Sequence, residues 1–428
     1  MSRFFLPLAL LVFCILPVIS HADSMRVWTS TSGTSIQAEL VESDWDKVVL
    51  LRENGSELRI KMNQLSPADQ DFLLKYIEEK NKGETGISEI NAVAGKVRQN
   101  VRCGDDSRWG YHLYLPKKFH RGREWAVCFV MASGGGKSFK PMQKYLSAAD
   151  RLGCVIALSI ESKNGFADSD IAMAAMADDV FERIPVIEGM AFSSGMSGGS
   201  RMAYLLAERD KRIAGVLACG SGSGVYLKEK DFRDAKLRSS TYVYSLIGTN
   251  DFNRTGASKS HDGFSKECRL RFFKGFHDWA GAPLIEQGLS RVYGAALEGY
   301  NGIDSQMLEL DYVKSVSALI KGLNEKAPWE AYYLSSYLDD QNLLTSELEV
   351  VHEILEKDER VHLALEAEND IRKFTKKYLV PVGFYVEDVQ PNVRREVEAN
   401  KLAGKYDSIP HGEMIRLLGK ASRPPKKK

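Results

Sequence analysis

The residues best suited to chemistry surround Ser197, which lies in the run Gly195-Met196-Ser197-Gly198-Gly199. This G-x-S-x-G pattern follows an apolar, strand-like run and precedes a helical stretch, so it predicts a sharp strand–turn–helix bend. The flanking glycines let such a turn pack closely against its neighbours. The bend would lift the Ser197 hydroxyl into solvent and aim the backbone N–H of Gly198 at a developing oxyanion. The pattern therefore predicts a nucleophilic serine.

A serine hydroxyl is a weak nucleophile at neutral pH and needs a base and an acid that orients the base. Asp251 comes just after the strand-like run 242–248, and His277 follows the run 270–275. Because the carboxyl ends of parallel strands meet at one edge of a sheet, we expect Ser197, Asp251 and His277 to converge as a triad. The alternatives are that Asp251 caps a turn and that His277 is a core or surface histidine.

Other titratable residues compete for these roles. His261 is a rival base, although it lies in a polar stretch that we read as a loop with no strand before it. Asp278 is a rival acid, but a residue adjacent to the base usually points elsewhere. His112 and His120 precede the serine and are interpreted as structural or surface residues.

The second donor to an oxyanion should come from the glycine loop 133–137, which follows the apolar run 125–132. Its sequence is Ser-Gly-Gly-Gly-Lys, and glycines let a backbone approach a substrate carbonyl closely. Gly134 or Gly135 could supply the N–H, and the sequence leaves the choice open. The loop lacks the spacing of a phosphate-binding P-loop. A further glycine-serine run, 220–224, has no clear helix behind it and is read as a loop.

The elements that must position these residues alternate between strand and helix. Strands are predicted at Gly110–Tyr114, Trp125–Ala132, Cys154–Ser159, Met190–Ser194, Ile213–Cys219, Tyr242–Gly248 and Leu270–Gly275. Helices are predicted at Phe139–Leu152, Asp168–Arg183, Gly199–Arg209 and Pro283–Glu298. This alternation predicts an α/β fold with a mainly parallel sheet that is covered by helices on both faces.

Residues 96–300 resemble the α/β-hydrolase superfamily. The resemblance is carried by the serine elbow, by Asp251 and by the ending Gly275-Phe276-His277-Asp278-Trp279. The likeness is nearest to secreted esterases of the polyhydroxybutyrate-depolymerase and feruloyl-esterase type. It implies an esterase that needs neither cofactor nor metal. Similar proteins carry a histidine before the glycine loop, which this chain lacks. Trp279, beside the base, is a candidate for substrate contact, with core packing as the alternative.

Residues 25–82 predict a small β-barrel of four short strands, with Asn54-Gly55 as a hairpin turn and a helix that begins after Ser66. The segment resembles the SH3-like Sla-one homology domain. The likeness rests on Trp28-Thr29, on alternating apolar residues from Ile36 to Val41, and on Leu65-Ser66-x-x-Asp69-Gln70. Such a module implies binding or spacing rather than chemistry. Residues 83–95 are read as a linker.

Residues 305–428 contain apolar residues at helical spacing and predict a helical C-terminal region. We expect this region to brace the catalytic core or to dock a partner. A protein or polysaccharide is the expected partner of either flanking region, beside an ester substrate.

The N-terminus has the pattern of a secretory signal peptide, residues 1–22: Arg3, an apolar run from Phe4 to Ile19, and small residues up to Ala22. An uncleaved anchor helix is the alternative. The expected location is secreted or periplasmic, without stable membrane insertion. Export permits disulfides, and Cys103 could pair with Cys154 or Cys268.

The composition is that of a globular protein: the chain has 428 residues, of which 44% are hydrophobic and 27% charged. Its net charge of +1 gives no field that would attract nucleic acid. An exported serine esterase is therefore the leading hypothesis. A peptidase on the same fold and a non-catalytic binding protein with a hydrolase-like scaffold are the alternatives.

Overall fold

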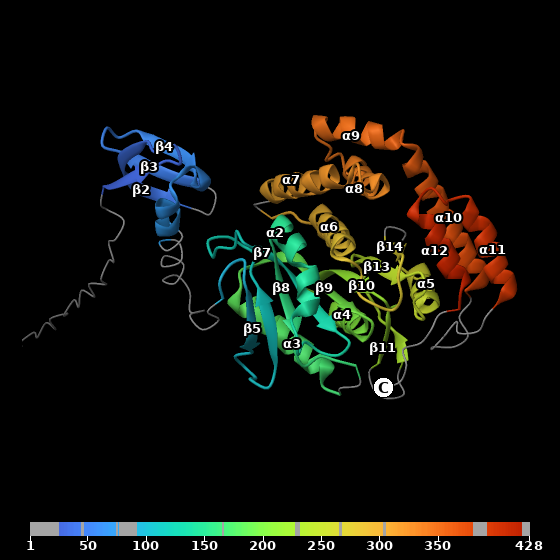
Figure 1. Ribbon diagram of the computed structural model, residues 1–428. Helices are drawn as coiled ribbons and strands as arrows, with labels where there is room; N and C mark the ends of the chain where they lie inside the picture. The colour runs from blue at the N-terminus through green and yellow to red at the C-terminus, as the bar shows by residue number, and fades with distance from the viewer. Residues whose placement is uncertain are drawn as a thin grey trace, which may run out of the picture. The chain divides into compact units, whose positions relative to one another are not determined.

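The computed structural model describes residues 25–43, 47–73, 76, 92–164, 167–226, 232–264, 268–302, 305–379 and 392–421 (Figure 1). The predicted signal peptide and most of the predicted linker lie outside these residues. The chain divides into two compact units, Met1–Thr85 and Gly86–Lys428. The sequence predicted two separate regions, 96–300 and 305–428, and both belong to the second unit.

The N-terminal unit holds an antiparallel sheet in the order β1-β2-β3-β4. Its strands are β1 (Arg26–Thr29), β2 (Ser35–Ser43), β3 (Lys47–Arg52) and β4 (Glu57–Lys61). The four predicted strands are thus confirmed, and Gly55 takes a positive φ of 77° in the Asn-Gly turn. A helix begins at Pro67, and the Ser66 hydroxyl accepts a hydrogen bond from the backbone N–H of Asp69.

A small hydrophobic cluster stabilises this unit. Its buried members are Trp28, Ala38, Leu40, Val48, Leu50, Met62, Leu65 and Leu73. The buried Asp69 carboxylate ties the helix to β1, because it accepts hydrogen bonds from the Thr29 N–H and from the Arg26 guanidinium. The unit therefore has a core of its own.

The second unit is built on an eight-stranded sheet in the order β14-β13-β10-β9-β7-β8-β6-β5. The strands are β5 (Val97–Arg102), β6 (Gly110–Tyr114), β7 (Trp125–Ala132), β8 (Cys154–Ser159), β9 (Val186–Met196), β10 (Ile213–Cys219), β13 (Tyr242–Gly248) and β14 (Arg269–Phe273). Only β6 runs against its neighbours; the other pairs are parallel. This mainly parallel sheet fits the α/β-hydrolase fold.

The sheet divides the core of this unit into two layers, because successive side chains of a strand point to opposite faces. On β7, for example, Cys128 and Val130 belong to one hydrophobic cluster, while Val127 and Phe129 belong to the other. Helices α2 (Leu146–Leu152) and α6 (Ala282–Glu298) cover the first face, and α3 (Ser169–Arg183) and α4 (Gly198–Arg209) cover the second.

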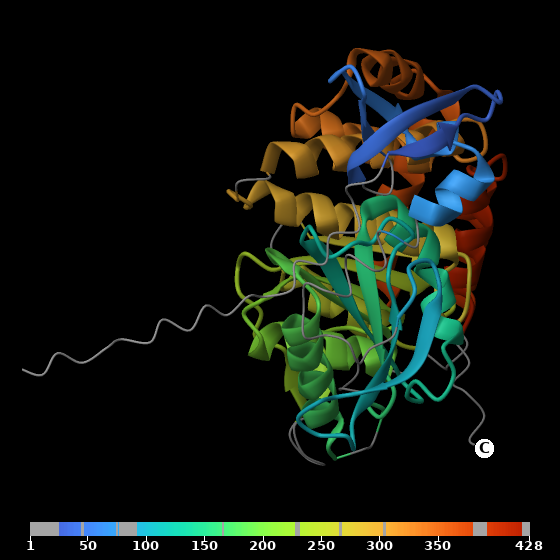
Figure 2. The same ribbon diagram turned by 90° about the vertical axis from the view of Figure 1, so that its left-hand side faces the viewer.

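The C-terminal region is helical, as predicted. It contains α7 (Ser305–Leu323), α8 (Pro328–Asp340), α9 (Ser346–Glu356), α10 (Glu359–Tyr378), α11 (Val393–Gly404) and α12 (Pro410–Gly419). Both views show α6, α7 and α8 stacked in succession (Figures 1 and 2). Residues of α7, α8 and α9 share a hydrophobic cluster with the first sheet face. These helices therefore extend the core of the second unit.

Several elements differ from the sequence analysis. The edge strand β5 and the two-stranded hairpin of β11 (Gly224–Tyr226) and β12 (Phe232–Asp234) were not predicted. His261 lies on helix α5 (Arg254–Asp262) and not in a loop. The helix predicted at 139–152 is a 3-10 turn, η2 (Lys140–Lys144), followed by α2.

The described cysteines are all free and buried: Cys103, Cys128, Cys154, Cys219 and Cys268. The disulfides that the sequence allowed are therefore not formed by these five residues. Of the described helices, none combines the length and the apolar character needed to cross a bilayer.

Candidate active site

Ser197 lies at the sharp turn between β9 and α4, where its backbone adopts φ 57° and ψ −117°. This region is costly for a residue with a side chain. Close packing around the turn holds it in this conformation. A Cβ at Gly195 would collide with Gly199, and a Cβ at Gly199 would collide with the backbone of β7. Ser197 stays partly exposed while the residues on both sides of it are buried. Its hydroxyl is therefore presented to solvent.

The Ser200 hydroxyl stabilises the turn through hydrogen bonds. Its single proton is shared between the carbonyl oxygens of Gly195 and Cys219, both at 2.7 Å, and its oxygen accepts from the Cys219 N–H at 2.8 Å. The Ser197 N–H also donates to the Cys219 carbonyl, at 2.8 Å. Three of these contacts join the elbow to the end of β10, and the contact with Gly195 lies within the elbow.

The structure brings together the three residues that the sequence predicted as a triad. His277 Nε2 lies 2.8 Å from Ser197 Oγ, and His277 Nδ1 lies 2.9 Å from Asp251 Oδ1. The Asp251 side chain is fully buried, whereas 18% of the His277 side chain is exposed. The imidazole is therefore within reach of both solvent and serine, and the carboxylate is shielded behind it.

The loops that carry the acid and the base are joined through their backbones. Thr249 N–H donates to the Phe273 carbonyl, and Asn250 N–H donates to the Gly275 carbonyl, both at 2.9 Å. The Asn253 N–H donates to Asp251 Oδ1 at 2.7 Å, which orients the carboxylate toward His277. The acid–base distance is thus set by the pairing of two adjacent strand ends.

The side-chain contacts of the rival residues are made with other groups. The carboxylate of Asp278 accepts a hydrogen bond from the Trp279 N–H. His261 packs edge-on against Phe264. His120 packs against Trp125. His112, however, contacts the glycine loop, as described below.

Of the two glycines considered as oxyanion donors, Gly135 has its N–H engaged by the Ala132 carbonyl at 2.9 Å. Gly135 also has a positive φ of 77°, and a Cβ there would press on the Ile160 carbonyl. Its role in this structure is to turn the loop. The Gly134 N–H has no hydrogen bond to any described part of the chain, and Gly134 is exposed. Gly134 is thus the better placed donor beside Gly198.

His112, which lies on β6, holds the glycine loop in place. Its Nδ1 accepts from the Asn100 N–H at 3.3 Å, so the proton is on Nε2, which donates to the Gly136 carbonyl at 2.6 Å. Burial lowers the pKa of His112, which favours this neutral form. The sequence analysis noted that the usual histidine before the loop is missing. A histidine on a neighbouring strand supports the loop instead.

Asn164 is a site residue that the sequence analysis missed. A Cβ at Gly198 would overlap the Asn164 carboxamide, so this exposed side chain lies directly against the elbow. The Asn164 N–H donates to the Ser133 carbonyl at 2.9 Å, which joins it to the glycine loop. No motif marks Asn164, because its proximity arises only when the loop after β8 folds across the sheet edge.

Aromatic side chains flank the base. The Phe252 ring lies 4.0 Å, centroid to centroid, from the His277 imidazole. Phe276 is 64% exposed and directly precedes His277. Trp279 packs edge-to-face on the buried Tyr145, with 6.0 Å between ring centroids, and joins the first hydrophobic cluster. Core packing is therefore the contact that the structure gives Trp279.

Within the described residues, no group of three or more ligating side chains is arranged to bind a metal ion. Cys219 lies close to the triad, but burial raises the pKa of its thiol to about 12. It therefore stays protonated at neutral pH and does not compete with Ser197 as a nucleophile.

No protein-family model matches this chain, and no curated protein matches it in sequence. Among solved structures, a ferulic acid esterase is 15% identical, with a TM-score of 0.40, over 48% of this chain and 99% of that one. FphF, a fluorophosphonate-binding serine hydrolase of Staphylococcus aureus, is 11% identical, with a TM-score of 0.38, over 47% and 99%. A putative dipeptidyl aminopeptidase IV from Bacteroides ovatus is 12% identical, with a TM-score of 0.37, over 63% and 43%.

Proposed function

We propose that this protein is a serine hydrolase that cleaves carboxylic esters. Ser197 Oγ attacks the ester carbonyl carbon while His277 Nε2 takes its proton. The Asp251 carboxylate accepts the Nδ1 proton of His277, keeps the ring oriented and stabilises the imidazolium that forms. What supports this assignment of roles is the unbroken line of hydrogen bonds from Ser197 to Asp251.

The tetrahedral intermediate carries its negative charge on the former carbonyl oxygen. We assign the N–H groups of Gly198 and Gly134 as its hydrogen-bond donors. Gly198 is the first residue of α4, so the positive end of the helix dipole adds to the stabilisation. His277 then gives its proton to the departing alcohol, and an acyl-enzyme remains on Ser197.

Water completes the reaction. His277 takes a proton from a water molecule, which attacks the acyl carbonyl, and Ser197 recovers its proton as the carboxylic acid leaves. Each step uses only side chains and backbone groups of this chain. Phe252 and the exposed Phe276 form an apolar border beside the base, so we expect the site to favour esters with an apolar group on that side.

Labelling with a fluorophosphonate probe, together with hydrolysis of p-nitrophenyl esters, tests this function. The wild-type protein should be labelled and active, and Ser197→Ala should lose both properties while staying folded. Ser223→Ala is the matched control. Ser223 lies in the second glycine-serine run, and its hydroxyl hydrogen-bonds to Asp234 rather than to a triad residue. Labelling should therefore persist in this variant.

Absence of labelling in folded wild-type protein would refute the enzyme assignment and leave a binding scaffold. Cleavage of aminoacyl-anilides at rates above those of esters would overturn the ester assignment in favour of a peptidase. The two substrate classes should therefore be assayed side by side with the same preparation.

We further propose that the protein is exported and that the N-terminal unit is an SH3-like binding module. The basis for export is the leader pattern of residues 1–22, and the basis for the module is its sequence likeness and its separate four-stranded sheet. Its expected ligand is a protein or a polysaccharide. Cell fractionation with N-terminal sequencing of the mature chain tests export, and loss of retention on a polymer or partner column after deletion of 25–82 tests the module.

A further inference from the structure

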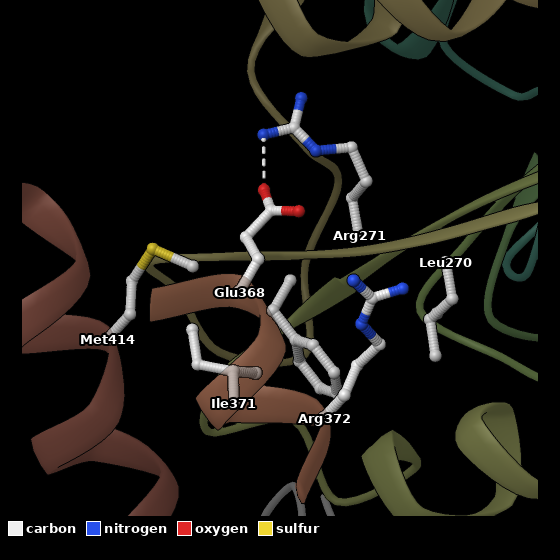
Figure 3. A pocket seen from close by; sticks show the side chains of 7 residues that line it. Leu270, Arg271, Glu368, Ile371, Arg372 and Met414 are labelled. Carbon is white, nitrogen blue, oxygen red and sulfur yellow. Dashed lines mark hydrogen bonds and ion pairs between the residues drawn. The ribbon is translucent and has the colours of Figure 1, made fainter. Parts of the chain in front are cut away.

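The C-terminal helices pack against the edge of the sheet that carries the catalytic base. Phe272 of β14 joins a hydrophobic cluster formed by α10, α11 and α12. Figure 3 shows this seam, with Arg271 from β14 facing Glu368 from α10 and Met414 from α12 nearby. The cavity among these side chains has a volume of only about 10 Å³, room for about one water molecule. The seam is therefore closely packed.

Arg271 joins the seam electrostatically. It is 6% exposed and pairs with Glu330 of α8 at 2.5 Å and with Glu368 at 3.1 Å. Burial alone would raise the pKa of the Glu368 carboxyl, but the charge of Arg271 lowers it to about 2. These buried ion pairs hold the helices on β14, but they do not touch the triad.

A second buried arginine connects the same helices to the catalytic acid. Arg254 is completely buried and begins α5, three residues after Asp251. Its guanidinium donates to the Thr249 carbonyl at 2.5 Å, within the loop that carries the acid. It also donates to the Leu417 carbonyl at 3.3 Å and to the Lys420 carbonyl at 2.8 Å, both at the end of α12.

The chemistry of these contacts explains why a charged side chain is stable there. The last carbonyl groups of a helix lack partners within the helix and carry its partial negative charge. An arginine with several N–H groups can bond to more than one of them at once. The backbone N–H of Arg254 also donates to the Asp251 carbonyl at 3.1 Å. One residue therefore contacts the acid loop at Thr249 and at Asp251 itself, and also contacts the end of α12.

We propose that Arg254 is a positioning residue through which the end of α12 holds the Asp251 loop at hydrogen-bonding distance from His277. The inference rests on the proposed function, since it concerns the same triad. It gives the C-terminal helical region a role in catalysis although none of its described residues contacts the triad. Loss of the Arg254 contacts lets the acid loop shift, which weakens the hold on the imidazole and also moves Phe252, which lies in the same loop.

The test compares Arg254→Met with Arg395→Met. Arg395 is also buried, and its Nε donates to the Gly419 carbonyl at 2.8 Å, but it comes from α11, far along the chain from the acid loop. Arg254→Met should lower kcat by about 100-fold, as expected for a small misplacement of a catalytic group, and should change KM far less than kcat. Arg395→Met should lower the unfolding midpoint and leave kcat intact.

Two further measurements keep the proposal testable. Arg254→Lys keeps the charge but not the fork of donors, so it should fold and show an intermediate kcat. The far-downfield proton signal of the His277–Asp251 hydrogen bond should weaken in both Arg254 variants and persist in Arg395→Met. The proposal is overturned if the Arg254 variants keep wild-type kcat, or if kcat falls equally in Arg395→Met. If the proposed function itself is wrong, the fluorophosphonate probe will not label Ser197 in the wild-type protein, which is a different result from either of these.

Discussion

Ser197 occupies a backbone conformation, φ 57° and ψ −117°, that lies outside the left-handed helical region and that only glycine adopts readily. The other described non-glycine residues with positive φ are Asn100 and Asn342, of a type that takes positive φ more often than most. A residue in such a region costs about 1–3 kcal/mol, so the surrounding contacts must fix it. The conformation places the hydroxyl above the turn and within reach of His277. The strain is thus connected to the proposed chemistry at this residue.

Gly198 is a glycine because Asn164 occupies the space of a side chain. Gly198→Ala should push the exposed Asn164 carboxamide aside at a cost of under about 1 kcal/mol in stability, and lower kcat/KM by about 10-fold because the displaced carboxamide crowds Ser197. The double variant Gly198→Ala/Asn164→Ala should recover most of both losses, since the collision is removed. Urea unfolding and ester kinetics of all four members of this cycle measure the coupling. Additive losses would show that Asn164 is not the obstacle.

His112 makes stability depend on pH. Burial lowers its pKa in the folded state below the ordinary value near 6.5, so the folded protein binds fewer protons than the unfolded chain as the pH falls. The contribution of the neutral ring is complete above pH 6.5 and is lost as the pH falls toward the lowered pKa. Between pH 7 and 5 the free energy of unfolding should fall by up to about 1.4 kcal/mol per pH unit from this proton.

The control for this pH effect is His112→Gln, whose amide can still donate to the Gly136 carbonyl but does not titrate. Denaturant unfolding at several pH values should give a shallower curve for this variant. Parallel curves for the two proteins would assign the pH dependence to other groups.

Three site residues were recognisable from the sequence because each follows an apolar strand run. Ser197, Asp251 and His277 carry this local signal. Asn164 and His112 carry none, because their contacts with the elbow and the glycine loop exist only across neighbouring strands. The choice between Gly134 and Gly135 also needed coordinates, since it depends on one backbone hydrogen bond.

At the scale of elements, the central strands of the sheet were predictable from the sequence, whereas the edge strand β5 and the short helix α5 were not. β7 and β8 are buried along their whole length, so their sequences are uninterrupted apolar runs. The edge strand β5 has mostly exposed residues, and α5 is a short polar helix with glycine and serine inside it. Neither has a hydrophobic period that sequence reasoning could detect.

The junction of β9, α4 and β10 depends on one hydroxyl. Ser200→Ala removes the proton shared by the Gly195 and Cys219 carbonyls and the oxygen that accepts from the Cys219 N–H, so it should destabilise the protein by about 1–3 kcal/mol and lower fluorophosphonate labelling of Ser197. Ser193→Ala is the matched control, since this buried serine on β9 makes one bond, to the Ala203 carbonyl. Equal labelling rates in both variants would contradict a special role for Ser200. Urea unfolding gives the stability of each.

At the scale of the whole molecule, the C-terminal helices belong to the same compact unit as the eight-stranded sheet. Tyr293 of α6 stacks on Tyr312 of α7, with 5.6 Å between ring centroids, and Leu334 of α8 lies in the same cluster. The sequence predicted these helices from their periodicity. It could not show what their apolar faces cover, because both partners of a packed pair look alike in sequence.

A chain truncated after Gly302 should therefore be insoluble or molten, since it exposes the apolar face that α7 and α8 cover. Expression followed by circular dichroism and dye binding checks this outcome. Deletion of residues 25–82 is the comparison and should leave a folded, active enzyme, because that unit has its own core. A soluble, active truncated chain would show that the helical region is dispensable.

The separate cluster around Trp28 also has a thermodynamic consequence. Two cores that share no residue can melt independently, each as its own cooperative block. A calorimetric scan of the intact protein should then record two endotherms of unequal enthalpy, in which the smaller belongs to fewer than sixty residues. An inhibitor bound at Ser197 should move the larger endotherm to higher temperature and leave the smaller one in place.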